Sequence, residues 1–390
     1  MDKINLISLE TVAFAKKIFG DKFVPLHRPV FEGNERLYLI DCIDSNFVSS
    51  VGSKVVEFEK KVAEFTGLNH AIATVNGTSA LHVAIELAGV KPGDEVISQA
   101  VTFVSTCNAI RYAGGEPVFV DVDIDTMGLS PVSLRRFLEK NGEKRSNGTF
   151  NKTSGRRISA CVPMHTFGFP CRIIEISEIC KDWNIALIED AAESLGSYVG
   201  KRHTGSFSSM GTLSFNGNKI ITTGGGGMII TDDPEMAKLA KHITTTAKVQ
   251  HPYEFMHDQI GYNYRLPNLN ASLGCAQMER LEEFLTIKAQ LAHQWGSFFY
   301  DMEVNFVKPI DGTTTNHWLN TIILPSRIDR DKFLQLTNDN NIMTRPLWTL
   351  MPKLPMFKNC QTDGLQNSFW LEDRVVNIPS SVPDNILQKG

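Results

Sequence analysis

From about residue 55 to residue 245, short runs of β-branched and apolar residues alternate with segments of helical periodicity. In residues 78–88, for example, Leu81, Ile85 and Ala88 recur at the spacing of one helix face. Such alternation predicts parallel strands joined by right-handed helical crossovers, with helices on both faces of the sheet. Ligands of such a sheet bind beyond the carboxyl ends of its strands.

Individual elements can be predicted from these runs. Strands are expected at 71–75, 95–98, 117–122, 158–162, 185–189, 211–215 and 227–231. The connecting helices include one that opens with Ser130-Pro131, which is a favourable N-cap and first-turn pair. Residues 141–157 are rich in Lys, Arg, Ser, Gly and Asn, and we expect them to form an exposed loop.

The chain has 390 residues, more than one hydrophobic core usually holds, so two domains are expected. A helix through residues 270–300 is predicted to join them. Residues 9–19 resemble a short amphipathic helix that packs on the body of the protein. We therefore predict an N-terminal helical arm (1–28), a large α/β domain (29–250) and a small α+β domain (251–390).

Composition excludes some functions and partners. Hydrophobic residues make up 42% and charged residues 21%, and the net charge is −4. Basic residues are scattered, so we expect no nucleic-acid partner, although a local basic pocket stays open. The apolar runs are too short to cross a membrane, and the start lacks a secretion signal. The seven cysteines show no C-x-x-C spacing, which favours free thiols in the cytoplasm and no metal site.

Asp190 and Lys219 indicate a specific chemistry. Asp190 ends the apolar run 185–190, and Lys219 precedes the glycine run Gly224–Gly227. A carboxylate at the tip of a buried strand can keep a pyridine nitrogen protonated, and a lysine can form a Schiff base with an aldehyde. The pair therefore suits pyridoxal 5′-phosphate (PLP). One Asp and one Lys at this spacing also occur in α/β proteins that bind no cofactor.

Four further residues could contact such a cofactor. Thr78 and Ser79 lie between a predicted strand and helix, where backbone N–H groups and hydroxyls can bind an anion or simply cap the helix. Phe103 begins the next helix from the same sheet edge and could stack on a ring or belong to the core. Ser214 could add a hydroxyl to a phosphate. The glycine run allows either close backbone approach or a mobile linker.

Four ordered motifs resemble those of the DegT-type nucleotide-sugar aminotransferases, and the resemblance extends from about Pro25 to Ser381. They are Gly77-Thr-Ser-Ala-Leu-His82, Glu189-Asp-Ala-Ala-Glu193, Ser214-Phe-Asn-Gly-Asn-Lys219 and Gly261-Tyr-Asn-Tyr-Arg-Leu-Pro-Asn268. The resemblance implies the PLP-dependent transferase fold type I. In that fold a large domain with a mostly parallel seven-stranded sheet, sandwiched by helices, is joined to a smaller α+β C-terminal domain.

The resemblance also implies roles for single residues at the cofactor. Lys219 would carry the cofactor and move a proton during the reaction, Asp190 would pair with the pyridine nitrogen, and Phe103 would stack on the ring. Glu193 would lie near the phenolic oxygen, where many relatives carry Gln, and this departure leaves its role open. The phosphate would be held by Thr78, Ser79 and Ser214.

Other implied roles concern the partner subunit and the substrate. Asn263 would reach the phosphate of the neighbouring subunit, so the expected assembly is a homodimer with shared active sites. His165 and Arg265 would contact the sugar or an anionic group of the substrate.

Within the family, the segments 47–52, 220–228 and 343–350 resemble aminotransferases of the bacillosamine and legionaminic-acid pathways. That resemblance implies L-glutamate as donor, pyridoxamine 5′-phosphate as intermediate, and the C4 ketone of a UDP-2-acetamido-4-keto-2,6-dideoxy sugar as acceptor, for surface glycans. One alternative is the same chemistry on a GDP-4-keto-6-deoxy sugar. Another is a non-catalytic regulator that binds PLP or a nucleotide sugar, although the intact Lys219 argues against it.

Overall fold

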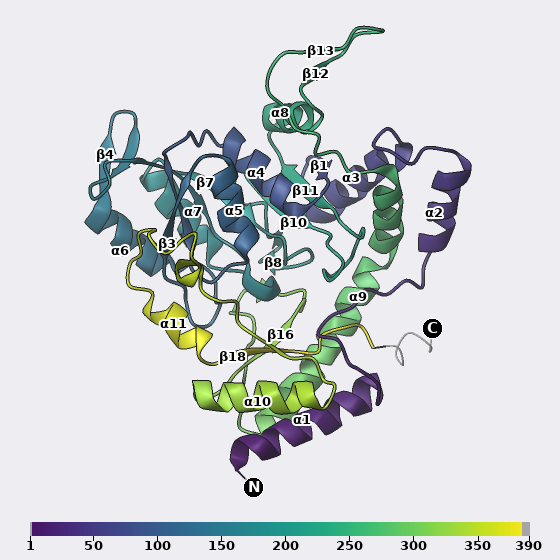
Figure 1. Cartoon of the computed structure of the whole chain (residues 1–390), viewed down its shortest axis with the longest axis vertical. Helices are drawn as coiled ribbons and strands as arrows, with labels where there is room; N and C mark the ends of the chain where they lie inside the picture. Colours follow the sequence, from purple (N-terminus) through teal and green to yellow (C-terminus); the bar gives the residue numbers. More distant parts are fainter. Residues whose placement is uncertain (1, 384–390) are drawn as a thin grey trace.

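The computed structural model describes residues 2–383, which form two modules joined by a long helix (Figure 1). Seven strands of the larger module pair in the order β1-β11-β10-β7-β6-β2-β3. Only β11 runs antiparallel to its neighbours along this path, and the four remaining pairings are parallel. The strands are β1 (His70–Thr74), β2 (Glu95–Gln99), β3 (Glu116–Val120), β6 (Arg157–Val162), β7 (Ala186–Asp190), β10 (Met210–Ser214) and β11 (Gly227–Thr231).

Helices cover both faces of this sheet, as predicted. On β11, Ile229 packs with α4 and α8, whereas its neighbours Met228 and Ile230 pack on the opposite face with α3 and α9. One face carries α4 (Gly77–Leu87), α5 (Val104–Tyr112) and α8 (Pro234–Thr244), and the other carries α3 (Ser53–Thr66), α6 (Pro131–Asn141), α7 (Ile173–Asp182) and part of α9 (Asn268–Asp301). The sandwich confirms the α/β fold class.

Residues 141–157 differ from the predicted exposed loop. They form the hairpin β4 (Gly142–Arg145) and β5 (Gly148–Asn151), and β5 pairs antiparallel with β6. The polar side chains misled the prediction because some of them are buried and paired: Asn151 is fully buried and its amide donates to the Glu95 carboxylate at 2.7 Å. A buried polar group is tolerated when it finds such a partner.

The smaller module is built around a four-stranded sheet with the order β14-β16-β18-β17. In its core Ile4 of α1 packs with Trp295 of α9 and Phe333 of α10, and α1 and α10 lie side by side in Figure 1. The N-terminal helix therefore packs on the body, as expected. The elements are α1 (Lys3–Phe19), β14 (Asn305–Phe306), β16 (Asn320–Ile323), α10 (Arg327–Asp339), β17 (Arg345–Pro346), α11 (Gln366–Glu372) and β18 (Val375–Ile378).

The remaining elements lie around the two modules. They are α2 (Glu35–Asp44), a three-stranded sheet of β8 (Tyr198–Val199), β9 (Arg202–His203) and β15 (Thr313–Thr314), and the hairpin of β12 (Lys248–Val249) and β13 (Met256–His257), which projects at the top of Figure 1.

Between residues 2 and 383, no helix is long and apolar enough to cross a membrane. The domain boundaries stay predictions, and Met1 and residues 384–390 lie outside the described residues.

Candidate active site

A cavity of about 250 Å³ lies at the carboxyl ends of β7 and β10. These strands are parallel neighbours, so Asp190, the last residue of β7, and Ser214, the last residue of β10, reach the same edge of the sheet. Ligands of a parallel sheet are expected beyond this edge. Six of the predicted residues line the cavity: Thr78, Phe103, Asp190, Glu193, Ser214 and Lys219.

One end of the cavity is formed by the start of α4. The Asn76 side chain caps this helix by accepting a hydrogen bond from the Ser79 N–H at 2.8 Å. A Cβ on Gly77 would lie 3.0 Å from the Ser214 Cβ, so the helix start and the end of β10 are in close contact. A Cβ on Gly227 would lie only 2.4 Å from the Asn76 carbonyl carbon, and this glycine therefore permits the close backbone approach considered from the sequence.

Asp190 is held by uncharged donors. Its side chain is almost fully buried, and it accepts hydrogen bonds from the Thr106 hydroxyl at 2.7 Å and from the Ala192 N–H at 3.2 Å. Thr106 in turn lies 2.7 Å from the hydroxyl of Thr102. Burial raises the pKa of Asp190 above its usual value, and the hydrogen bond from Thr106 opposes that shift.

Lys219 lies between an acid and an aromatic ring. Its Nζ is 3.1 Å from Glu193 Oε1 and 4.0 Å from the centre of the Trp318 ring. The indole N–H of Trp318 donates to the Asn218 carbonyl oxygen at 2.7 Å, which fixes the residue next to Lys219. Burial raises the pKa of Glu193 to about 7, although the positive charge of Lys219 acts in the opposite direction.

Four predicted residues do not line this cavity. Ser79 is buried in the first turn of α4. His165 is fully buried, its Nε2 donates to Glu189 at 3.0 Å, and its Nδ1 accepts from the Cys171 N–H. The other two lie on the segment after β13: Asn263 is exposed, and Arg265 contacts the Thr245 carbonyl oxygen at 3.3 Å.

The cavity also contains residues that sequence reasoning missed. Trp318 and Trp348 line it, and both come from the smaller module, for which the sequence predicted only an α+β fold. Trp348 lies in the segment 343–350 that resembles relatives, but no role at the site followed from it. The position of both rings depends on how the two modules pack. Thr106 is different: it lies three residues after Phe103 at the start of α5, so helical spacing could have placed it near the same sheet edge.

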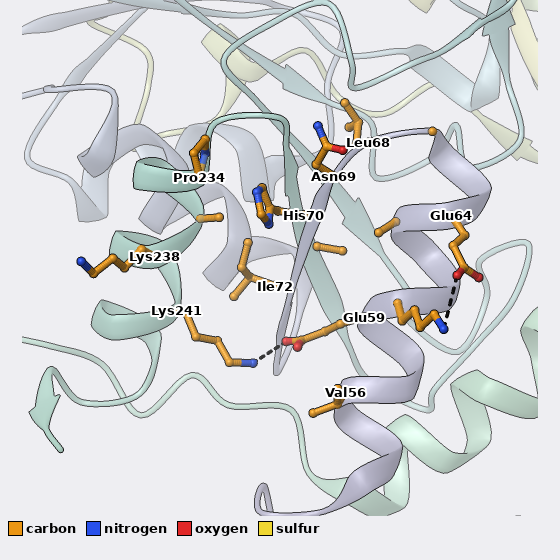
Figure 2. A pocket seen from close by; sticks show the side chains of 15 residues that line it. Val56, Glu59, Glu64, Leu68, Asn69, His70, Ile72, Pro234, Lys238 and Lys241 are labelled. Carbon is orange, nitrogen blue, oxygen red and sulfur yellow. Dashed lines mark hydrogen bonds and ion pairs between the residues drawn. The ribbon is translucent and has the colours of Figure 1, made fainter. Parts of the chain in front are cut away.

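A larger groove, of about 740 Å³, lies between α3 and α8 and over the edge strand β1 (Figure 2). Glu59 on α3 pairs with Lys241 on α8 at 2.5 Å and also accepts a hydrogen bond from the Ala73 N–H of β1. Glu64 pairs with Lys60 on the same helix. Both acids therefore already pair with lysines of α3 and α8.

The residues around the smaller cavity fit the cofactor predicted from the sequence. A helix start with two nearby hydroxyls suits a phosphate, and a buried carboxylate suits a protonated pyridine nitrogen. Lys219 offers the amine that an aldehyde requires, and Phe103, which is 48% exposed, presents an aromatic face at the opening. The donor set therefore matches PLP.

Comparison with known proteins agrees with this chemistry. Residues 30–383 match the DegT/DnrJ/EryC1/StrS aminotransferase family. EpsN of Bacillus subtilis (strain 168), named as a pyridoxal phosphate-dependent aminotransferase, is 36% identical over 86% of this chain and 84% of its own. GDP-perosamine synthase of Vibrio cholerae is 33% identical over 92% and 94%.

A solved structure of a DegT DnrJ EryC1 StrS aminotransferase from Brucella abortus is similar with a TM-score of 0.81. It is 25% identical, and the match covers 89% of this chain and 90% of that one. The family match spans both modules and includes every residue that lines the cavity. The chain belongs to the DegT/DnrJ/EryC1/StrS aminotransferase family and is a PLP-dependent sugar aminotransferase.

Proposed function

We propose that this enzyme transfers the amino group of L-glutamate to the C4 ketone of a nucleotide-linked 4-keto-6-deoxy sugar. The observation that carries the proposal is the meeting of Asp190, Glu193 and Lys219 in one cavity that begins at the α4 N-terminus. Family membership supports the amine transfer, and the name of the Vibrio cholerae relative supports a nucleotide sugar as acceptor.

In this proposal each side of the cavity holds one part of PLP. The N-terminus of α4, with the hydroxyls of Thr78 and Ser214, would bind the phosphate, because its free N–H groups and dipole favour an anion. Ser79 would contribute through its place in the same first turn. Asp190 would face the pyridine nitrogen, and Phe103 would pack on the ring. When bound, PLP supplies a carbon that accepts the amino group and a ring that withdraws electrons from it.

The protein's own side chains then transfer protons and limit the access of water. Lys219 provides a movable amine that can take a proton from one carbon and return it to another. The Trp318 ring covers this amine and shields it from solvent on that side. Thr106 keeps the Asp190 carboxylate in place, so that its charge stays directed at the ring nitrogen.

A second subunit would complete the site. Asn263 is exposed and lies outside its own cavity, which is the placement expected of a residue that serves a neighbouring subunit. Arg265 lies two residues after Asn263 in the same segment, and its Nε is buried without a hydrogen-bond partner within residues 2–383. We propose a homodimer in which Asn263 reaches the partner's phosphate site.

Two nucleotides are the main candidates. The sequence motifs favour a UDP-linked 2-acetamido-4-keto-2,6-dideoxy sugar, for amino sugars of surface glycans. A GDP-linked 4-keto-6-deoxy sugar is the second candidate, because a relative that is 33% identical over 92% of the chain is a GDP-perosamine synthase. His165 is fully buried, so any effect on the sugar would act through neighbouring residues.

Isotope transfer tests the proposal directly. The purified protein is mixed with ¹⁵N-labelled L-glutamate and with UDP-, GDP- or dTDP-linked 4-keto-6-deoxy sugars in turn, and the products are analysed by mass spectrometry. The expected result is ¹⁵N incorporation into one nucleotide sugar and none with the Lys219→Ala control. If no sugar in the panel acquires the label while the protein carries bound PLP, the proposed acceptor class is wrong.

A further inference from the structure

Glu193 is placed to exchange a proton with Lys219. Its Oε1 lies 3.1 Å from the Lys219 Nζ, within hydrogen-bond reach. The side chain of Glu193 is 2% exposed and that of Lys219 is 13% exposed, so water has little access to the contact. A proton that leaves the amine therefore has a nearby acceptor inside the cavity.

The rest of Glu193 is fixed by the protein. Its Oε2 accepts a hydrogen bond from the Phe167 N–H at 2.9 Å, and its backbone carbonyl accepts one from the Asn316 side chain at 2.8 Å. These bonds leave Oε1 directed at Lys219. The carboxyl is consequently anchored by one oxygen and free to bind or release a proton at the other.

The other ionisable groups nearby are less suited to this exchange. Both oxygens of Asp190 already accept hydrogen bonds from Thr106 and Ala192. Burial, reinforced by Lys288 and Lys219, holds the pKa of His27 well below its usual value, so this ring is a weak base. His165 lies behind Asp190 and is bonded to Glu189.

We propose that Glu193 is a catalytic residue that accepts the proton which the Lys219 ammonium must lose before its amine can attack the cofactor aldehyde. In this step the N–H bond breaks and its electron pair stays on Nζ, while an O–H bond forms at Oε1. An ion pair becomes a neutral pair, so the total charge in the cavity does not change. The inference rests on the proposed function only in naming the aldehyde as the target of the amine.

The raised pKa of Glu193, about 7, gives this pair a characteristic pH dependence. Below pH 7 the Glu193 carboxyl already carries a proton and cannot accept the one that Lys219 must lose, so this step becomes slower as the pH falls. Above pH 7 the carboxylate form of Glu193 predominates, and the step no longer depends on the protonation of Glu193. Reactivity of Lys219 should therefore rise up to about pH 7 and then stay level.

Labelling of the full chain, freed of cofactor, tests this. Trace acetic anhydride is added between pH 5.5 and 8.5 with free phenylalanine as internal standard, and acetylation of Lys219 is quantified by mass spectrometry. The wild-type rate should rise about tenfold per pH unit, the slope of one titrating proton, and level off near pH 7. In Glu193→Gln, which keeps an acceptor for the Phe167 N–H but cannot take up a proton, the rise should continue without a bend at pH 7.

The control is Glu59→Gln, which removes the acid of the Lys241 pair outside the cavity (Figure 2) and should leave the Lys219 profile unchanged. If the Lys219 acetylation rate of Glu193→Gln still levels off near pH 7, the proposal is overturned. If the levelling is lost in Asp190→Asn instead, the proton exchange belongs to Asp190. If Glu193→Gln does not fold, as judged by thermal unfolding, Glu193→Asp is used, and a bend that does not move overturns the proposal. The labelling needs no cofactor, so a failure of the aminotransferase assay would leave this result intact.

Discussion

Replacing Asp190 by Asn separates the charge of this residue from its place in the structure. The Asn carbonyl oxygen can accept the hydrogen bond from the Ala192 N–H, and its amide can donate to the Thr106 hydroxyl. The Thr106 proton can then turn to Thr102, whose hydroxyl is 2.7 Å away. The groups that bond to Asp190 in the wild type all keep a partner, so the free energy of unfolding should change by less than about 1 kcal/mol.

Burial raises the pKa of Asp190, so the folded protein bears a cost for keeping this carboxylate ionised at neutral pH. Asn removes that cost, and the melting temperature should not fall. The rate should fall strongly, however, because a hydrogen bond to a charged group contributes roughly 1.5–3 kcal/mol, and the dry site favours the upper end. The expected loss is on the order of 100-fold.

The assay is the half-reaction with L-glutamate, followed by the change in cofactor absorption in a stopped-flow instrument, beside a thermal unfolding curve. Thr106→Val is the matched control, since it removes one donor to Asp190 and keeps the charge. Its rate should fall less than that of Asp190→Asn. A rate for Asp190→Asn within about tenfold of wild type, or about 1.4 kcal/mol, would show that Asp190 is not the partner of the ring nitrogen.

Three further outcomes are expected. Lys219→Ala should fold normally but lose turnover, and borohydride should fix the cofactor covalently on Lys219 in the wild type; labelling of another lysine contradicts this. Asn263→Ala and Lys219→Ala homodimers should both be inactive, and co-folded mixtures should partly recover activity, because one of the two sites in a heterodimer keeps both residues; heterodimers without any gain place Asn263 in its own site. Trp318→Phe should lower the free energy of unfolding by about 1 kcal/mol, because the Asn218 carbonyl loses its donor; denaturant unfolding measures this.

Local patterns in the sequence predicted the larger module well. Parallel strands and crossover helices produce strong periodicities, and Asp190 at a strand end was placed correctly because strand ends share one sheet edge. The hairpin at residues 142–151 was missed because the buried Asn151 depends on a partner 56 positions earlier in the chain, Glu95. Such pairing is not visible in local composition.

The cavity was predicted in part. Glu193 was recognised as a departure from relatives, but its contact with Lys219 depends on how the loop after β10 folds back, which no spacing indicates. Trp318 lies two residues before β16, and its contact with Lys219 arises from packing between modules. Residues whose position depends on long-range packing are the ones that the sequence alone could not identify.

The long helix α9 has a consequence for how the protein unfolds. Its 34 residues extend about 51 Å. Leu281 and Phe284 complete the core that holds Phe58 beneath the large sheet, whereas Trp295 and Phe299 belong to the core of the smaller module. If either core unfolds, α9 loses the tertiary contacts with that core that help to keep it helical. The two modules should thus unfold as one cooperative unit, and a proteolytic cut within α9 would destabilise both ends of the molecule.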